Sequence, residues 1–199
     1  MSRRLVLGSA SPARLATLRG AGIRPEVVVS GVDESVVATR DPARLAVELA
    51  VLKARTVAAG IHDAVVIGCD SVLELDGEVH GKPRDAAEAR RRWRTMRGRT
   101  GVLHTGHCLV DTGTGREVAR SGDTVVHFAD VSDAEIDAYV ATGEPLRVAG
   151  AFTLDGLGGA FVTGIEGDPH NVVGISLPLL RTMLGELEVA WTDLWDTSG

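Results

Sequence analysis

Residues 64–69 read Ala-Val-Val-Ile-Gly-Cys, an unbroken apolar run that lies between Asp63 and Asp70. A continuous apolar run bounded by polar residues is typical of a β-strand that is covered on both faces. We therefore expect residues 64–69 to form the central strand of a sheet. Asp70 then stands at the carboxyl end of that strand, where open α/β sheets place their ligands, and an acid next to an apolar run needs a partner.

Outside this strand, helix and strand patterns alternate at first and a β-rich segment follows. We expect further strands at residues 5–7, 27–29, 101–110, 118–129 and 171–173, and a hairpin over 72–80 that turns at Asp76-Gly77. We expect helices after Ser11-Pro12, over 44–59, from Asp85 to about 97, from Ser132 to about 142, and over 177–187. Residues 149–167 are rich in glycine and read as loop with short strands, and the polar tail from Trp191 onward is expected to pack loosely. This order predicts an α/β or α+β fold with a mixed sheet, in which one domain over residues 1–199 has two lobes with a ligand cleft between them.

Charge and cysteine content exclude several classes of protein. The 199 residues carry 21 Lys and Arg against 27 Asp and Glu, a net charge of -6. We therefore expect no nucleic-acid partner, although a small anion can still bind at a local cluster of cations and N–H groups. Cys69 and Cys108 both lie in apolar runs and are expected to be reduced thiols of a cytoplasmic protein. The apolar residues before Gly8 are too few for a signal peptide and no stretch is long enough for a membrane span, so we also expect no membrane partner.

The turn between the first strand and the first helix reads Gly8-Ser9-Ala10-Ser11-Pro12-Ala13-Arg14. Ser11 suits the N-cap and Pro12 the first helical position, so the free N–H groups of the helix point into the loop beside two hydroxyl groups. With the helix dipole and Arg14 one turn later, this arrangement favours a phosphate site. Taken alone, the motif more often marks a well-capped helix and nothing more, because caps of this type are common.

Two acids and two lysines could complete such a site. Glu34 lies in a polar loop after the second strand and Asp70 ends the central strand, and carboxylates from separate loops can hold Mg²⁺ together with substrate phosphate oxygens. Lys53 stands among apolar residues of the second helix, and Lys82 precedes a proline in a loop. Each of these three residues also has a simpler explanation. Glu34 can be a solvated surface acid, Lys53 can pack its aliphatic stem on the helix while its ammonium reaches water, and Lys82 can be part of an ordinary turn.

Two apparent motifs are rejected on spacing. The segment Gly77 to Pro83 has too few residues between its glycines for a P-loop and ends in proline where a serine or threonine is required. His104 and His107 cannot share a metal ion, because on a strand they point to opposite faces.

The order of these motifs resembles the Maf family, which was named for septum-formation inhibition and comprises nucleoside triphosphate pyrophosphatases. The resemblance spans about residues 5–187. The matching pieces are Gly8-Ser9-Ala10-Ser11-Pro12-Ala13-Arg14, Val32-Asp33-Glu34, Leu52-Lys53-Ala54, Gly68-Cys69-Asp70-Ser71-Val72, Gly81-Lys82-Pro83, Thr105-Gly106, Glu144-Pro145-Leu146, Ala149-Gly150-Ala151-Phe152, Gly156-Leu157-Gly158-Gly159 and Asn171-Val172-Val173-Gly174.

The resemblance implies an α/β fold with a mixed twisted sheet and two lobes flanking a deep cleft, like that of inosine triphosphate pyrophosphatases. It implies hydrolysis of the α–β phosphoanhydride of a nucleoside triphosphate, including modified nucleotides, to monophosphate and pyrophosphate, with Mg²⁺ or Mn²⁺ as cofactor. It assigns Asp70 as the catalytic base, with Glu34 and Asp70 as metal ligands. The substrate-binding positions it implies are Ser9, Ser11, Arg14, Lys53, Ser71 and Lys82.

Among the positions where the chain departs from the family pattern, three change the charge or hydrogen bonding near these motifs. Ala13 stands where the family often has an arginine, and Val148 where a lysine is common, so two positive charges are lost. Asp155 replaces a glutamine of the pyrimidine-specific branch, and an ionised carboxylate only accepts hydrogen bonds. These losses keep a second hypothesis open, a nucleotide-binding regulator of cell division with little hydrolysis. A homodimer is the expected assembly because two-fold dimers are the commonest soluble oligomers.

Overall fold

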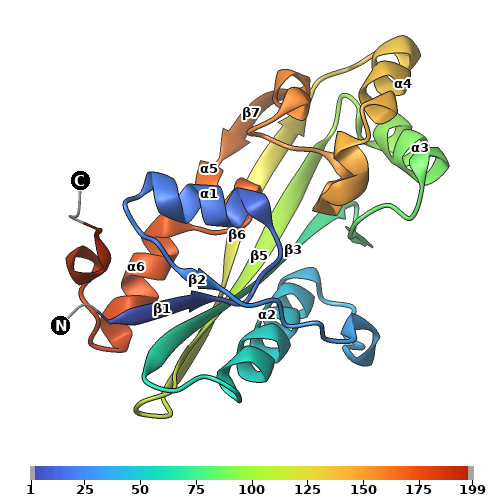
Figure 1. The fold of residues 1–199 in the computed structure, drawn as a ribbon. Helices are drawn as coiled ribbons and strands as arrows, with labels where there is room; N and C mark the ends of the chain where they lie inside the picture. The colour runs from blue at the N-terminus through green and yellow to red at the C-terminus, as the bar shows by residue number, and fades with distance from the viewer. Residues whose placement is uncertain (1–2, 197–199) are drawn as a thin grey trace.

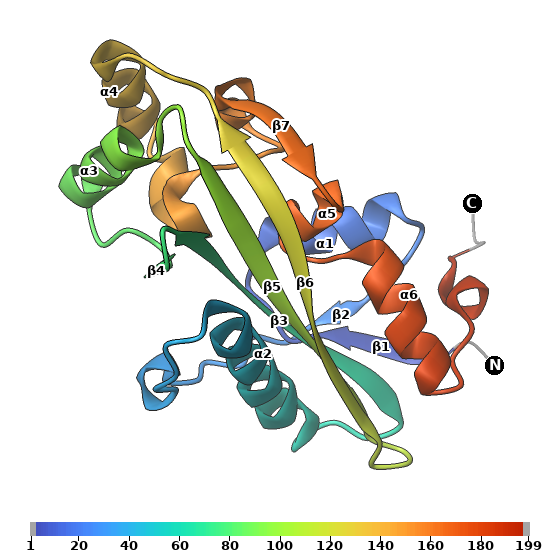
Figure 2. The same cartoon turned by 180° about the vertical axis from the view of Figure 1, so that it is seen from behind.

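The computed structural model describes residues 3–196, and within them one mixed sheet of seven strands carries helices on both faces (Figures 1 and 2). The strands are β1 (Arg4–Leu7), β2 (Glu26–Val27), β3 (Ala64–Leu75), β4 (Glu78–His80), β5 (Thr100–Asp111), β6 (Glu117–Phe128) and β7 (Val162–Glu166). The α-helices are α1 (Pro12–Gly20), α2 (Pro42–Ala58), α3 (Ala86–Met96), α4 (Asp133–Ala141), α5 (Pro169–Val173) and α6 (Leu177–Glu186). Short 3₁₀ turns are η1 (Glu34–Val36), η2 (Glu144–Arg147), η3 (Ala149–Ala151), η4 (Leu157–Phe161) and η5 (Trp191–Leu194). The mixed α/β class expected from the sequence is confirmed.

The predicted central strand is one of three long strands in the middle of the sheet. The strand order is β2-β1-β3-β5-β6-β7, with β4 paired to the far end of β3. β1 runs parallel to β2 and β3, and the other neighbours are antiparallel. β3, β5 and β6 have 12 residues each, or about 40 Å at the usual rise per residue. These strands are therefore long enough to carry helices at two places along their length.

Helix α2 packs directly on one face of the sheet because two strand residues there lack side chains. A Cβ atom at Gly68 would lie 2.3 Å from the carbonyl oxygen of Ala50, and one at Gly106 would lie 2.1 Å from that of Ala46. Ala50 and Ala54 are fully buried in this contact. This close approach also fixes the position of Lys53, which lies on α2.

The opposite face carries two separate hydrophobic clusters along the same strands. On β3, Ile67 and Cys69 pack with α1 and α6 in the first cluster. Leu73 and Leu75, farther along β3, pack with α3 and α4 in the second cluster, which is centred on the fully buried Trp93. The indole of Trp93 makes edge-on contacts with three aromatic rings and donates a hydrogen bond to the carbonyl of Ala151 at 2.8 Å.

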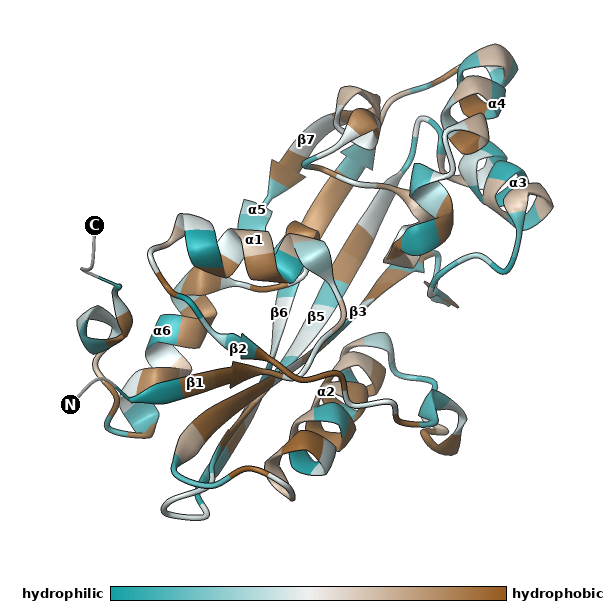
Figure 3. Ribbon diagram, in the orientation of Figure 1, coloured by the Kyte–Doolittle hydropathy of each residue, from teal (hydrophilic) through white to brown (hydrophobic). Residues whose placement is uncertain are grey.

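A belt of polar residues separates these two clusters, and we call it the polar belt: Ser71, Thr105, His107 and Asn171. Thr105 and His107 are fully buried and Asn171 is 1% exposed. The paler ribbon in the middle of β5 and β6 in Figure 3, against the brown of β1, marks the same change in polarity. This face of the sheet is thus apolar toward both ends of the long strands and polar in the middle.

Two expectations for the C-terminal part of the chain are wrong. Residues 171–173 belong to helix α5 and not to a strand, because Asp168 caps the helix with its side chain and Pro169 occupies the first turn. The tail from Trp191 does not pack loosely as far as it is described, since Leu194 is 6% exposed and Trp195 forms a bridge with Ile23. Residues 197–199 lie outside the described residues.

Two other expectations are confirmed. Cys69 and Cys108 are free and buried, and burial raises the pKa of their thiols to about 11 and about 12. The hairpin turns at Asp76 and Gly77, both with positive φ. In addition, none of the helices between residues 3 and 196 combines the length and apolar character needed to cross a membrane.

Candidate functional site

The candidate site lies at a short gap in the edge of the sheet. β1 pairs with β3 as far as Leu7 and Ile67, and the amide of Gly8 donates to the carbonyl of Ile67 at 2.7 Å. β4 first pairs with β3 at Leu73, so residues 68–72 have β5 as their only neighbouring strand. Asp70 and Ser71 lie in this gap with their side chains on opposite faces. A ligand that approaches the open edge can therefore meet groups from both faces of the sheet.

On the α2 face, one lysine joins the two predicted metal ligands. The ammonium of Lys53 donates a hydrogen bond to a carboxylate oxygen of Asp70, and it lies 2.7 Å from a carboxylate oxygen of Glu34. The side chains of Lys53 and Asp70 are 12% and 14% exposed, whereas that of Glu34 is 55% exposed. Lys53 is thus a buried ion-pair partner and not a snorkelling stem. Asp70 has the partner that its apolar neighbours required.

These two carboxylates also form a donor set that suits a hard divalent cation. Mg²⁺ is commonly held by one or two carboxylates, with phosphate oxygens and water completing its six ligands. Within residues 3–196, no group of three or more His, Cys, Asp or Glu side chains is arranged so that it could hold a metal ion. Glu34 and Asp70 therefore fit a metal that arrives with a phosphorylated substrate better than a cage made by the protein alone.

On the other face, the turn before α1 presents hydroxyl groups whose hydrogen atoms are free. The Ser9 hydroxyl oxygen accepts from the amide of Ser11 at 3.1 Å and from the guanidinium of Arg14 at 3.2 Å. The Ser11 hydroxyl oxygen accepts from the amide of Arg14 at 3.4 Å as the N-cap of α1. Because both oxygens act as acceptors inside the turn, both O–H groups remain available to donate to an anion. The amide of Ala13 makes no hydrogen bond within residues 3–196 and adds a third donor.

Arg14 connects this turn to the polar belt. Its guanidinium donates to the carbonyl of Gly174 at 2.7 Å and to the hydroxyl of Ser71 at 3.1 Å, in addition to Ser9. The Thr105 hydroxyl donates to the carbonyl of Asn171 at 2.9 Å, so the Ser71 hydroxyl donates to Thr105, 2.9 Å away. Ser71 is therefore the middle of a hydrogen-bonded chain, and its proton is used inside the protein.

Lys82 stands apart from the other predicted residues. It is exposed and makes no hydrogen bond or ion pair with any residue between 3 and 196. The preceding Gly81 is anchored to η3 and α3, because its carbonyl accepts from the amide of Gly150 at 3.1 Å and from the nearly buried guanidinium of Arg92. The structure thus leaves a free ammonium group on an anchored loop, but does not bring it into contact with Asp70 or Lys53.

A pocket of about 400 Å³ lies between the start of α1 and the segment 142–157, and we call it the cleft pocket. Pro12 and Ala13 form one side of it, so it adjoins the hydroxyl-bearing turn. Glu144 organises the other side: its carboxylate accepts from the hydroxyls of Tyr139 and Thr153 at 2.9 and 2.5 Å. It also accepts from the amides of Leu157 and Gly158 at 3.1 and 3.0 Å. Burial alone would raise the pKa of Glu144, but these hydrogen bonds outweigh burial and hold the pKa below its ordinary value of 4.5.

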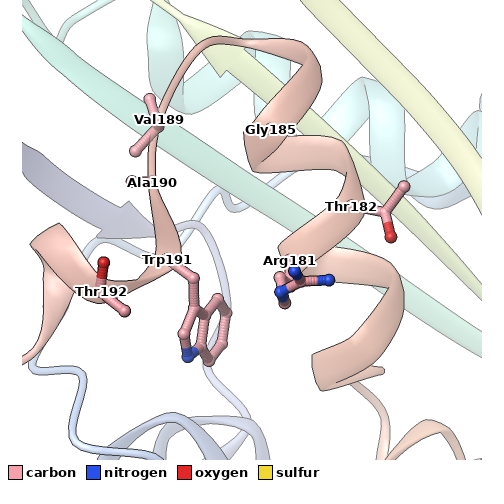
Figure 4. Close-up of a pocket in the computed structure, with 7 residues that line it drawn as sticks. All are labelled: Arg181, Thr182, Gly185, Val189, Ala190, Trp191 and Thr192. Carbon is pink, nitrogen blue, oxygen red and sulfur yellow. The ribbon is translucent and has the colours of Figure 1, made fainter.

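A second pocket, of about 410 Å³, lies between α6 and the turn η5 (Figure 4). Arg181 and Trp191 line it, and the figure shows the indole and the guanidinium on the same side of the helix. Like the cleft pocket, it contains none of the residues that the sequence analysis assigned to a site, but unlike the cleft pocket it includes no residue of the turn at 8–14. We therefore place the candidate site at the cleft pocket and the gap in β3.

Sequence reasoning missed the residues that hold this site together. Thr105, Asn171 and Glu144 were noted only as parts of a resemblance, without a role. Asp168-Pro169 was the available signal for Asn171, because that pair starts a helix and a buried polar residue in a helix needs partners. The side-chain amide of Asn171 donates to the carbonyl of Gly122 at 2.9 Å. This contact could not be predicted while residues 171–173 were expected to form a strand.

Fold and site together define a mixed α/β protein in which a turn with free hydroxyl and amide donors lies beside a lysine-bridged pair of acids. The chain matches the family model of the Maf-like proteins over residues 4–187. It is 61% identical to a Salinispora tropica protein over 96% of this chain and 87% of the relative. It is 60% identical to one of Streptomyces coelicolor over 97% and 95%, and 54% identical to one of Cutibacterium acnes over 98% and 96%. Each of these relatives is named nucleoside triphosphate pyrophosphatase. The chain belongs to the Maf family.

Proposed function

We propose that this chain is a nucleoside triphosphate pyrophosphatase, which hydrolyses its substrate to a nucleoside monophosphate and pyrophosphate. The observation that carries the proposal is the arrangement around β3: free hydroxyl and amide donors on one face and the Glu34–Lys53–Asp70 group on the other. A phosphate chain that lies across the open edge at residues 68–72 would contact both. The names of the relatives support the same reaction.

Each group has a role that follows from its chemistry. The hydroxyls of Ser9 and Ser11 and the amide at the start of α1 bind phosphate oxygens. Lys53 and Lys82 stabilise the charge that develops as the phosphoanhydride breaks. Asp70, or alternatively Glu34, accepts the proton of the attacking water molecule. Arg14 holds Ser9 and Ser71 in position with three of its five N–H groups, and its remaining N–H groups can donate to phosphate oxygens.

We further propose that Glu34 and Asp70 hold a divalent cation, Mg²⁺ or Mn²⁺, when substrate is bound. Such an ion neutralises phosphate charge and so adds to the effect of the lysines. Lys53 already contacts both carboxylates, which supports the idea that they converge on one cation position. The homodimer also remains a prediction, to be checked by light scattering.

A second candidate function is a nucleotide-binding regulator with little hydrolysis. It is favoured by Ala13 and Val148, two apolar residues that line the cleft pocket. Purified protein incubated with Mg²⁺ or Mn²⁺ and a panel of nucleoside triphosphates distinguishes the two. Monophosphate plus pyrophosphate supports the pyrophosphatase. Diphosphate plus orthophosphate would mean that the other anhydride is cleaved, and tight binding without products would favour the regulator.

A further inference from the structure

The cleft pocket has an apolar lining next to the phosphate-binding turn. Pro12 and Ala13 form one side, and Val148 and Leu157 lie on the other. Leu157 keeps 59% of its surface exposed and so leaves apolar area that a ligand in the pocket can cover. Flat aromatic ligands bury this kind of surface well. The base of a nucleotide whose phosphates lie at Ser9 and Ser11 could therefore pack here.

Two charged side chains in the same pocket have no partner among the described residues. Asp155 and Arg147 line the pocket, both are exposed, and neither side chain makes a hydrogen bond or ion pair within residues 3–196. Glu144, the other acid of the pocket, already accepts four hydrogen bonds. The pocket thus offers a ligand one free carboxylate, which only accepts, and one free guanidinium, which only donates.

We propose that Asp155 and Arg147 select guanine as the base of the substrate, an inference that rests on the proposed function. Guanine carries two adjacent donors, the N1–H and the 2-amino group, that match the two oxygens of a carboxylate. It also carries the acceptors O6 and N7, which a guanidinium contacts in bidentate fashion. Uracil and thymine have a single N–H donor, and adenine and cytosine present one amino group beside an acceptor. Only guanine therefore uses both unpartnered side chains fully.

The decisive comparison is GTP against ITP, whose base lacks only the 2-amino group, with UTP as a pyrimidine reference. We expect the kcat/KM for pyrophosphate release from GTP to exceed that from ITP by about tenfold or more, because one of two paired donors is lost. In Asp155→Asn this ratio should fall toward one. The matched control is Asp130→Asn, which changes an exposed acid outside the pocket and should keep the wild-type ratio.

Equal kcat/KM values for GTP and ITP, or a higher value for UTP, would overturn the inference and leave the pyrophosphatase function standing. An equal loss with both purines in Asp155→Asn would also overturn it. If no nucleotide releases pyrophosphate, the proposed function fails. Equilibrium binding of GTP and ITP to the wild-type protein then decides the inference, and equal affinities refute it.

Discussion

Asp70 is the side chain on which the chemistry of the site depends most. Replacing it with asparagine removes the group that accepts a proton, so we expect kcat to fall at least about 100-fold. The fold should survive, because Lys53 keeps Glu34 as a partner at 2.7 Å. Pyrophosphate release measures the effect, and circular dichroism checks the fold.

The matched control for Asp70→Asn is Asp137→Asn, which removes one partner of the surface ion pair with Arg90. It should retain full activity because it changes an acid of α4 far from the gap in β3. Near-normal turnover by Asp70→Asn would refute the assigned role, and Glu34→Gln would then be the next variant to measure.

The sequence was informative for those residues whose role is signalled locally. Ser11 and Pro12 indicate a capped helix, and Asp70 stands directly after an apolar strand. The helix start and the position of Asp70 could therefore be predicted without a structure. The contacts of Arg14 with Ser71 and Gly174 join residues 57 and 160 positions apart. No local pattern encodes such pairs, which is why the internal use of the Ser71 proton could not be foreseen.

Among the elements, the contact between α2 and the sheet sets the position of Lys53. The apolar spacing that predicts this helix includes Leu45, Leu49 and Leu52, and of these only Leu49 is buried, whereas Ala46, Ala50 and Ala54 are fully buried. The reason is the missing side chains at Gly68 and Gly106, which leave room for small residues only. Periodicity locates a helix, but the side of it that faces the sheet depends on the partner strand.

A methyl group at Gly68 should separate α2 from the sheet. Its Cβ would lie 2.3 Å from the Ala50 oxygen and 2.7 Å from the Ala54 nitrogen, so we expect Gly68→Ala to destabilise the protein by about 1–3 kcal/mol. Activity should fall as well, because α2 carries Lys53. Urea unfolding and pyrophosphate release measure the two effects.

Gly185→Ala is the control for this substitution. Gly185 lies in α6 with nothing within 4 Å of an added Cβ. An alanine there should leave activity intact and stabilise the helix by about 0.5–1 kcal/mol. If the two variants unfold alike, the close packing of α2 is not what holds it in place.

The loop that faces the start of α1 depends on the ionised form of Glu144. Glu144→Gln replaces an acceptor oxygen by a donor amide opposite four donors, so we expect a loss of about 2 kcal/mol at pH 7. The pKa of Glu144 is lowered in the folded protein, so its contribution is present above the ordinary value of 4.5 and disappears as the pH falls through the folded pKa. Unfolding curves at pH 7 and in acid should therefore show a difference between variant and wild type that shrinks in acid.

Glu78→Gln is the comparison for Glu144→Gln, since Glu78 is exposed and its side chain makes no hydrogen bond or salt bridge within residues 3–196. It should match the wild type at both pH values. A difference between Glu144→Gln and the wild type that does not change with pH would mean that packing, and not charge, explains the loss.

At the scale of the whole molecule, His107 ties the sheet to the last helix. One ring nitrogen donates to the carbonyl of Thr105 at 2.9 Å and the other accepts from the amide of Ser176 at 2.8 Å, so the ring is neutral. Burial, with a smaller effect from Arg14, lowers its pKa from 6.5 to about 4. As the pH falls, His107 is therefore protonated in the unfolded chain before it is protonated in the folded protein. Between these pH values we expect His107 to reduce the free energy of unfolding by up to about 1.4 kcal/mol per pH unit.

The test compares the pH dependence of unfolding in His107→Gln and His62→Gln over pH 7 to 4. Removing the exposed His62 should leave the slope of the wild type, whereas removing His107 should make it shallower. The comparison uses slopes and not absolute stabilities, so it holds even if His107→Gln is less stable throughout. Identical slopes would show that His107 does not govern stability in acid.

The gap in β3 also has a consequence for how the protein behaves at high concentration. An unpaired strand edge is a template for strands of other molecules and so promotes aggregation. Here the unpaired edge covers only residues 68–72 between β1 and β4, and Asp70 places a charged pair within it. An edge that is short and charged is a poor template for intermolecular pairing. The opening can therefore stay accessible to small molecules without itself becoming a site of edge-to-edge association.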